Sequence, residues 1–288
     1  IFFCWGFTST SVDMLIPRIK SMFDLSYTSA LLIQFSFFLA YLFVPIPAGK
    51  FVQGYGYRQS LFIGIALTAL GVLSLAPSVM LQFYPAFLGG IFVTASGIAV
   101  LQVTANPMIL SLGNPITAPR RLMFSQAFNS LGTTIAPVIA SVSLLSIDTL
   151  STDQINLLPL GEKATYHQDS TRATISFALV LGSLVGILAL IIRALPQLNL
   201  QSSKKTQTAD KTVISSYLSL LKKRKVYLGM GAIFFYVGAE VTIGSLLINY
   251  MRREDVLAIE ASDASALVAV YWGLAMLGRF AGVAALKW

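Results

Sequence analysis

The chain has 288 residues, of which 56% are hydrophobic and only 11% are charged. Soluble globular domains carry about 25% charged residues, and a soluble domain of this length has no interior large enough for so much apolar surface. The single cysteine excludes a scaffold held by internal disulfides, and the high hydrophobicity excludes a disordered chain. The composition therefore predicts an integral membrane protein.

Long apolar stretches follow one another along the chain, and each is close to the roughly 20 residues that a helix needs to cross a bilayer. The predicted spans are residues 1–19, 29–53, 59–79, 83–112, 118–146, 172–194, 228–250 and 264–286. A membrane β-barrel would instead show short segments of alternating polarity. We therefore expect an all-α, polytopic membrane protein with eight visible transmembrane helices.

Basic residues collect in alternate loops, which is typical of the cytoplasmic side of a membrane protein. With a cytoplasmic N-terminus, the basic residues on the cytoplasmic flanks are Lys50, Arg58, Arg120, Arg121, Arg193, Lys204, Lys205, Lys211, Lys222, Lys223, Arg224, Lys225, Arg279 and Lys287. Most acidic residues fall in the opposite loops. The net charge of +8 thus indicates membrane orientation and no nucleic-acid partner. The run 222–225 is interpreted as a topology signal, with contact to the bilayer surface as the alternative.

A polar segment, residues 195–227, separates six predicted spans from the last two. Many transporters consist of two six-helix halves. We therefore expect an N-terminal six-helix bundle at 1–194, a cytoplasmic linker at 195–227, and the first two helices of a second bundle at 228–288. The pattern predicts a fragment of a twelve-helix protein, and no cleavable signal peptide is readable at its start.

An acidic residue, Asp13, lies inside the first predicted span, where an ionisable side chain is costly and usually functional. A carboxyl group there can take up and release a proton, as a proton-coupled carrier requires. Pro17 cannot donate to the carbonyl of Asp13, so we expect the helix to be distorted beside the acid. Trp5, two turns earlier, suits stacking on a sugar ring. The alternatives are a structural aspartate paired with a neighbouring helix and an interfacial tryptophan anchor.

Two pairs of amide side chains lie in adjacent predicted spans. Gln102 and Asn106 are four residues apart, and Gln126 and Asn129 are three apart, so each pair shares a helix face. Amides donate and accept hydrogen bonds, which suits neighbouring sugar hydroxyls. Hydrogen bonds that only hold the helices together are the alternative.

Two further polar residues lie within predicted spans. Glu240 suits a second proton site, an acceptor for a sugar hydroxyl or an ion-pair partner, whereas Gln34 is a weaker candidate because packing readily absorbs one amide. No hydrolase, metalloprotease or phosphate-loop motif is present, and the single histidine leaves neither a Ser-His triad nor a histidine-based metal site. The sequence thus predicts a protein that is not an enzyme and holds no metal.

Several stretches together resemble the fucose–proton symporter family of the major facilitator superfamily, and within it the bacterial glucose/galactose transporters. They are FFCWGF followed by VDMLIP, then LIQFSFFLAYLFVPIPAGK, VLQVTANP, SQAFNSLGTTIAP, FYVGAEVTIGS and AVYWGLAMLGRF. The resemblance implies twelve helices, alternating access and sugar uptake driven by a proton. It further implies that Asp13 is the proton-linked acid, that Trp5 is its tryptophan neighbour, and that Gln126 and Asn129 lie near the sugar.

Three features depart from the family pattern. Gln102 stands where fucose carriers have Glu, which favours the glucose/galactose branch, and Val12 precedes Asp13 where family members often have Asn. The loop GKFVQGYGYR lacks the charged pair of the facilitator gating motif. The residues of that motif that remain are Gly49, Gly56 and Arg58.

The sequence therefore predicts a proton-coupled importer of a monosaccharide such as glucose or galactose, multi-pass in a bacterial inner membrane, with no cofactor besides the coupling ion. The expected proton sites are Asp13 and Glu240, and the expected sugar contacts are Trp5, Gln34, Gln102, Asn106, Gln126, Asn129 and Glu240. Alternatives are sodium coupling, an amino sugar or fucose as cargo, export, a channel, a membrane enzyme, and a sugar sensor that does not transport. The clustering of polar residues at mid-helix favours an occluded site over a channel. The oligomeric state stays open.

Overall fold

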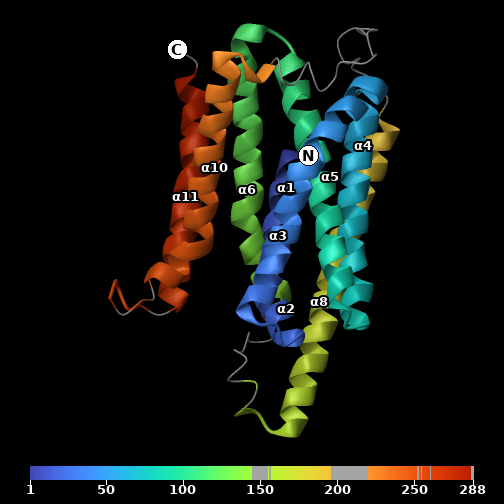
Figure 1. The fold of residues 1–288 in the computed structure, drawn as a ribbon, viewed down its shortest axis with the longest axis vertical. Helices are drawn as coiled ribbons and strands as arrows, with labels where there is room; N and C mark the ends of the chain where they lie inside the picture. The colour runs from blue at the N-terminus through green and yellow to red at the C-terminus, as the bar shows by residue number, and fades with distance from the viewer. Residues whose placement is uncertain are drawn as a thin grey trace. The chain divides into compact units, whose positions relative to one another are not determined.

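A computed structural model (Figure 1) describes residues 1–144, 155, 157–195, 220–251, 253, 255–259 and 261–286, and every regular element among these residues is a helix. The helices are α1 (Phe2–Asp13), α2 (Ile16–Met22), α3 (Tyr27–Phe43), α4 (Pro45–Met80), α5 (Tyr84–Ser111), the 3-10 turn η1 (Pro115–Thr117), α6 (Ala118–Leu144), α8 (Leu160–Ala194), α10 (Arg224–Met251) and α11 (Ala261–Ala285). The prediction of an all-α chain is confirmed.

The chain divides into two compact units. The first unit comprises Ile1–Ser203 together with Met276–Trp288, and the second comprises Lys204–Ala275. Most of the predicted linker, residues 196–219, lies outside the described residues, and α10 begins at Arg224 within the predicted linker's last turn. The domain boundaries expected from the sequence stay a prediction.

The first predicted span is divided into two helices. Helix α1 ends at Asp13 and α2 begins at Ile16, with Pro17 in the first turn of α2. A proline is tolerated in a first turn because the N–H that it lacks has no partner within the helix there. The expected distortion beside Asp13 is therefore confirmed, and it takes the form of an interruption.

The second and third predicted spans are joined more closely than the sequence suggests. Helix α3 ends at Phe43, and α4 begins at Pro45 and continues to Met80. The expected loop is reduced to a kink at Gly56, whose φ of 79° and ψ of 175° lie in a region that is essentially restricted to glycine. Figure 1 shows the first turns of α4 set at an angle to the rest of the helix.

Three helices in the described part of the chain are long and apolar enough to cross a membrane, namely Pro45–Met80, Tyr84–Ser111 and Gly161–Ala194. Two shorter apolar helices are Thr28–Phe43 and Val270–Ala285. Fewer helices therefore meet this criterion than the eight predicted spans. The reason is plainest at the first span, because its interruption leaves two pieces that are each too short.

Helices α4 and α5 pack closely along a seam of small residues. A Cβ atom added to Gly71 would overlap the backbone of Thr94, and one added to Gly97 would overlap the backbone of Thr68. Small residues at a helix interface let the two backbones approach, which is the usual way in which membrane helices associate. This seam fixes α5, which carries Gln102 and Asn106, against α4.

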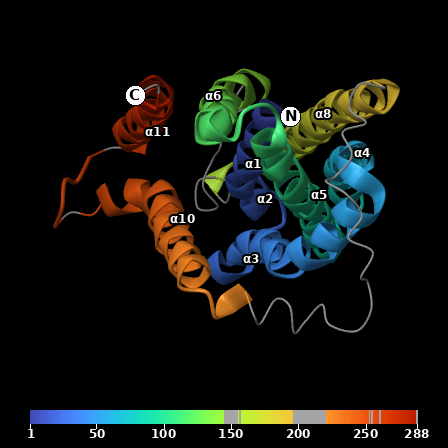
Figure 2. The same cartoon turned by 90° about the horizontal axis from the view of Figure 1, so that it is seen from above.

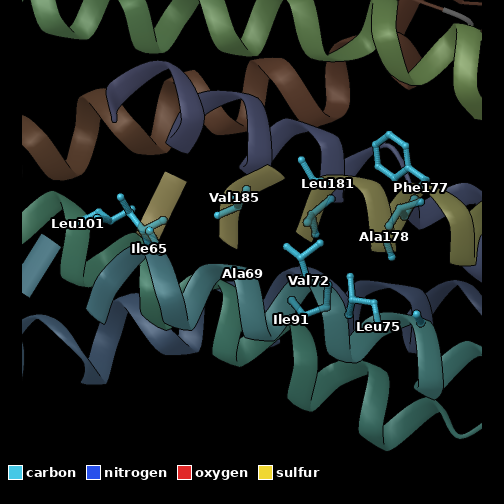
Figure 3. Packing of buried hydrophobic residues seen from close by; sticks show 14 of the residues in the cluster. Ile65, Ala69, Val72, Leu75, Ile91, Leu101, Phe177, Ala178, Leu181 and Val185 are labelled. Atoms are coloured by element: carbon cyan, nitrogen blue, oxygen red, sulfur yellow. The ribbon is translucent and has the colours of Figure 1, made fainter. Parts of the chain in front are cut away.

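An apolar core lies between α4, α5 and α8 (Figure 3). Its fully buried members include Ile65 and Leu75 on α4 and Ile91 on α5, and Leu181 and Val185 face them from α8. Seen from above (Figure 2), α4 lies beside α5 and α8, whereas α1 lies beside α5 and α6. The same core continues to α1 and α2 through the buried side chains of Val12 and Ile19.

The contact between α1 and α6 is also close. A Cβ atom added to Gly6 would overlap the backbone carbonyl of Asn129, and one added to Gly132 would overlap the carbonyl of Phe3. This packing places Trp5 and Asn129 in neighbouring turns of facing helices.

The second unit contains α10 and the N-terminal part of α11. Among the residues of this unit that the structure describes, Met251 and Val268 are buried hydrophobic residues, and Leu247, Ile259 and Trp272 pack against them. Glu240 lies on α10 within this unit.

Candidate functional site

Asp13 is the last residue of α1, and its side chain is exposed on the surface of the first unit. The neighbouring side chains of Val12 and Leu15 face the core, each with 2% of its surface exposed. The first unit therefore presents an accessible carboxyl beside the α1–α2 interruption.

A tyrosine on α3 is the partner of Gln102. The side-chain amide Nε2 of Gln102 donates a hydrogen bond to Oη of Tyr41 at 2.8 Å, which joins α5 to the last turn of α3. The predicted sugar contact Gln102 is therefore oriented by a residue of another helix.

The predicted amide pairs meet across helices. Nε2 of Gln126 on α6 donates to Oδ1 of Asn106 on α5 at 3.2 Å, and both side chains are half-buried. Since each amide retains further donor and acceptor capacity, this pair can also serve hydroxyl groups of a ligand. The structure therefore brings Asn106 and Gln126 together.

Asn129 has a structural contact instead. Its Nδ2 donates to the backbone carbonyl of Phe2 at 3.2 Å, at the close α1–α6 packing around Gly6. The ring of Phe2 lies 5.5 Å from the ring of Trp5, centroid to centroid. Asn129 and Trp5 consequently lie close together at the α1–α6 interface. This geometry favours the alternative in which Asn129 joins the two helices by a hydrogen bond.

Gln34 and Glu240 are placed apart from these groups. Gln34 is half-buried on α3, seven residues before Tyr41 and therefore on the same helix face. Glu240 lies in the second unit, where Oη of Tyr236 donates to its Oε1 at 3.2 Å. A shallow apolar groove of about 440 Å³ lies along α10 and is lined by Phe234, Phe235, Gly238, Ala239, Thr242 and Ile243, so Glu240 is not among its lining residues.

The residues of the loop motif lie at one end of the first unit. Gly49 and Gly56 are in α4, and the guanidinium of Arg58 donates to the carbonyl of Arg193 in the last turn of α8. The guanidinium of Arg193 lies 5.2 Å from the ring centroid of Phe62. Arg58 thus ties the start of α4 to the C-terminus of α8, where a cation is favoured by the helix dipole.

A second arginine, Arg121, binds the C-terminal end of α5 at the same end of the first unit. Arg121 on α6 donates to the carbonyls of Ile109 at 3.3 Å and Leu110 at 3.1 Å, in the last turn of α5. Both cations belong to the predicted cytoplasmic set, and both bind carbonyls in the last turn of a helix, where a basic side chain is favourable.

Two polar residues at helix contacts, Tyr41 and Arg18, are not among the predicted site residues. Tyr41 shares a face of α3 with Gln34, so its i, i+7 spacing is a signal that was available. Arg18, which the loop pattern assigns to the external flank, is only 2% exposed and interacts with Tyr166 of α8. No spacing in the sequence indicates that this cation is buried.

The described residues contain no group of three or more His, Cys, Asp or Glu side chains that could hold a metal ion. The predicted site residues on α1, α3, α5 and α6 supply an exposed carboxyl, an indole, a phenol and side-chain amides, of which Gln102 binds Tyr41 and Asn106 binds Gln126. Such a set can exchange hydrogen bonds with a neutral polyhydroxyl ligand and bind a proton.

Comparison with known proteins agrees with this architecture. The profile of the Major Facilitator Superfamily matches residues 1–288. The glucose/galactose transporter of Brucella abortus (strain 9-941) is 39% identical over 288 residues, which are 100% of this chain and 65% of that protein. The putative glucose/galactose transporter of Helicobacter pylori (strain J99) is 35% identical over 284 residues, which are 99% of this chain and 65% of that protein. The L-fucose-proton symporter of Escherichia coli (strain K12) is 29% identical over 283 residues, which are 98% of this chain and 64% of that protein.

Solved structures give the same answer. A crystal structure of the Escherichia coli fucose:proton symporter superposes with a TM-score of 0.84 at 27% identity, covering 99% of this chain and 69% of that one. A second structure of that transporter, in the outward conformation, gives a TM-score of 0.85 at 28% identity with the same coverage. The chain therefore spans about two thirds of the length of these proteins, and the family resemblance inferred from the sequence is confirmed.

Proposed function

The chain belongs to the major facilitator superfamily, and we propose that it serves the proton-coupled import of a monosaccharide. The observation that carries this proposal is the set of polar side chains that meet between α3, α5 and α6, in which Gln102 binds Tyr41 and Gln126 binds Asn106. The names of the relatives, glucose/galactose transporters and fucose–proton symporters, support the same substrate class.

The proposed sugar contacts come from α5, α6 and α1. Asn106 and Gln126 hold each other at 3.2 Å, so they are oriented before a sugar arrives, and an oriented amide loses little conformational entropy on binding. Trp5 offers an apolar face for the sugar ring. A hexose fits this set because its hydroxyl groups both donate and accept, as the amides do.

Asp13 is the proposed proton site. An ionised carboxyl must keep its hydration or a partner when the two halves of a transporter rock around the bound ligands, whereas a protonated carboxyl is neutral and moves at lower cost. Proton binding from outside would therefore permit the inward transition, and release inside would reset the carrier. Glu240 is a second proposed proton or sugar site on α10.

The proposed setting is a bacterial inner membrane with the N-terminus in the cytoplasm. The binding of Arg58 and Arg121 to helix C-termini at one end of the first unit supports this orientation, because basic residues concentrate on the cytoplasmic side. Cysteine accessibility at Gln59 and at Asp24, which lie at opposite ends, tests it in intact cells. Labelling of a cysteine at position 59 by an impermeant reagent would contradict the proposed orientation.

Replacement of the acid tests the coupling. We expect Asp13→Asn in the complete protein, reconstituted into vesicles, to abolish sugar accumulation against a gradient while sugar counterflow continues, because counterflow needs no net proton movement. Asp24→Asn is the matched control, since Asp24 is an exposed loop residue at φ 47°, a conformation that asparagine also tolerates.

Two outcomes would contradict the proposal. Undiminished uphill uptake by Asp13→Asn would remove Asp13 from the coupling mechanism. Uptake that needs a sodium gradient and ignores a pH gradient in the unmodified protein would replace the proton by sodium. Counterflow measured against hexoses, fucose and N-acetylhexosamines decides the sugar.

A further inference from the structure

The hydrogen-bond acceptor of Gln102 is held in place by α3. Nε2 of Gln102 donates to Oη of Tyr41 at 2.8 Å, and both side chains are half-buried. The ring of Tyr41 stacks on the ring of Phe37, with centroids 5.4 Å apart and an interplanar angle of 26°, and lies 6.3 Å from the ring of Phe38. Aromatic contacts of this kind restrict the direction of the tyrosine ring. The Tyr41 hydroxyl therefore has a defined position before a ligand binds.

This hydrogen bond determines which end of the Gln102 amide is left for a ligand. A side-chain amide carries two N–H donors on its nitrogen and an acceptor oxygen on the opposite side. The nitrogen of Gln102 faces Tyr41. Among the residues that the structure describes, none donates to Oε1 of Gln102, and this oxygen is not one of the buried polar atoms that lack a partner. Oε1 is therefore an accessible acceptor.

The other amide on this face of α5 is bound through its opposite end. Asn106, one turn after Gln102, uses its oxygen Oδ1 to accept the hydrogen bond from Nε2 of Gln126 at 3.2 Å. Its N–H groups donate to no residue in the described part of the chain. Residues one turn apart have Cβ atoms about 5–6 Å apart, which two hydroxyl groups of one hexose can span. The face thus offers an acceptor at Gln102 and donors at Asn106.

We propose that Tyr41 is a positioning residue that makes Gln102 a hydrogen-bond acceptor toward the sugar. The position facing Gln102 then requires a hydroxyl group that donates, whereas the position facing Asn106 requires only an atom that accepts. This inference rests on the proposed function and deepens it, because it names the hydrogen-bond pattern by which the site selects a neutral monosaccharide.

A fluorine atom in place of one hydroxyl group distinguishes these positions. Fluorine is close to a hydroxyl group in size but carries no hydrogen to donate. Opposite Gln102, it would leave Oε1 without a donor in a site closed to water, and an unpaired acceptor of this kind lowers affinity about tenfold. Without the Tyr41 hydroxyl, the amide can turn over and present an N–H group to the fluorine, so this penalty shrinks.

The variant Tyr41→Phe tests the proposal, because it removes the hydroxyl and keeps the ring that packs on Phe37 and Phe38. Counterflow by the complete protein in vesicles is competed with the transported hexose and with its singly deoxyfluorinated analogues. We expect the unmodified protein to reject fluorine about tenfold at one hydroxyl position, and Tyr41→Phe to reject it there about threefold or less. Affinity for the parent hexose should stay within about threefold.

Two further variants separate positioning from stability. Tyr84→Phe is the matched control, since the Tyr84 hydroxyl donates to the carbonyl of Ser29 at 2.6 Å and so also joins α5 to α3. A merely structural role of Tyr41 predicts a lower thermal stability from both variants and unaltered rejection of fluorine. Gln102→Leu removes the acceptor itself. In that background Tyr41→Phe should not change the rejection of fluorine, because Tyr41 acts through Gln102.

The outcomes separate this inference from the proposed function. Equal rejection of fluorine by Tyr41→Phe and the unmodified protein overturns the role of Tyr41. An equal loss of affinity for the hexose and all its fluorinated analogues also overturns it, and so does the absence of any rejected analogue in the unmodified protein. All three results leave sugar import intact. Absence of counterflow with every sugar refutes the proposed function itself, and with it this inference.

Discussion

The two faces of α5 differ in what they pack against. The face toward α4 consists of small and apolar side chains, with Thr94 and Gly97 in backbone contact with Gly71 and Thr68. The face toward α3 and α6 carries Gln102 and Asn106, and its contacts are hydrogen bonds of 2.8 and 3.2 Å between side chains.

One face of α5 is therefore held by rigid backbone packing, and the other by side-chain hydrogen bonds that a ligand can replace. Where two backbones touch at a glycine, an added side-chain atom cannot be accommodated, because protein interiors are close-packed. Side-chain hydrogen bonds can be traded for bonds to a ligand at little net cost. We therefore expect substitutions on the α4 face to alter folding, and substitutions on the amide face to alter binding.

The largest effect is expected at the α4–α5 seam. Gly97→Val would force a Cβ atom and two methyl groups against the Thr68 backbone, and overpacking of this kind costs about 3 kcal/mol. Thermal unfolding in detergent measures the loss. Gly89→Val is the control on the same helix, because a Cβ atom there meets no other atom within 4 Å. Equal stability of the two variants would mean that the seam is not tightly packed.

An intermediate effect is expected at the amide pair, and in binding rather than folding. Gln126→Leu leaves Oδ1 of Asn106 without its donor, and we expect the apparent affinity for sugar to fall about tenfold. Counterflow titration measures it, and Gln59→Leu, at an exposed position of α4, is the control. A lower unfolding temperature with unchanged sugar affinity would show that this face of α5 holds the helices together and does not bind sugar.

The smallest effect is expected at Gly56, which belongs to neither face. Its φ of 79° and ψ of 175° penalise any side chain, so Gly56→Ala should cost about 1–2 kcal/mol although a Cβ atom has open space. Gly54→Ala is the control, since Gly54 has equally open space and an alanine within a helix is favourable. If both variants unfold at the same temperature, Gly56 does not hold a kink in solution.

Composition and the spacing of apolar stretches were sufficient to predict the fold. The positions of nearly all helices follow from the length of apolar runs, and Pro17 predicts the interruption beside Asp13. The predicted span 29–53 is divided at Val44, and its last part continues through Gly56 into the span 59–79 as α4. This was not predictable, because whether Gly56 makes a loop or a one-residue kink depends on the packing of its flanking helices.

The site could be predicted in part, for a reason that is specific to helices. Spacing identifies residues that share a face of one helix, and it found Gln102 with Asn106 and Gln126 with Asn129. It does not identify the facing helix, so neither the Asn106–Gln126 bond nor the attachment of Asn129 to Phe2 was foreseen. Tyr41 was missed although it shares a face of α3 with Gln34, because it lies in an aromatic stretch that suggests only apolar packing.

The interruption between α1 and α2 has a mechanical consequence. Pro17 has no N–H, so it cannot donate the helical backbone hydrogen bond to the carbonyl of Asp13. A backbone hydrogen bond is therefore missing at the residue that bears the accessible carboxyl. Bending stiffness along this segment is therefore lowest where the charge would change. A change of charge at Asp13 would therefore occur at the point where α1 and α2 can change their angle most easily.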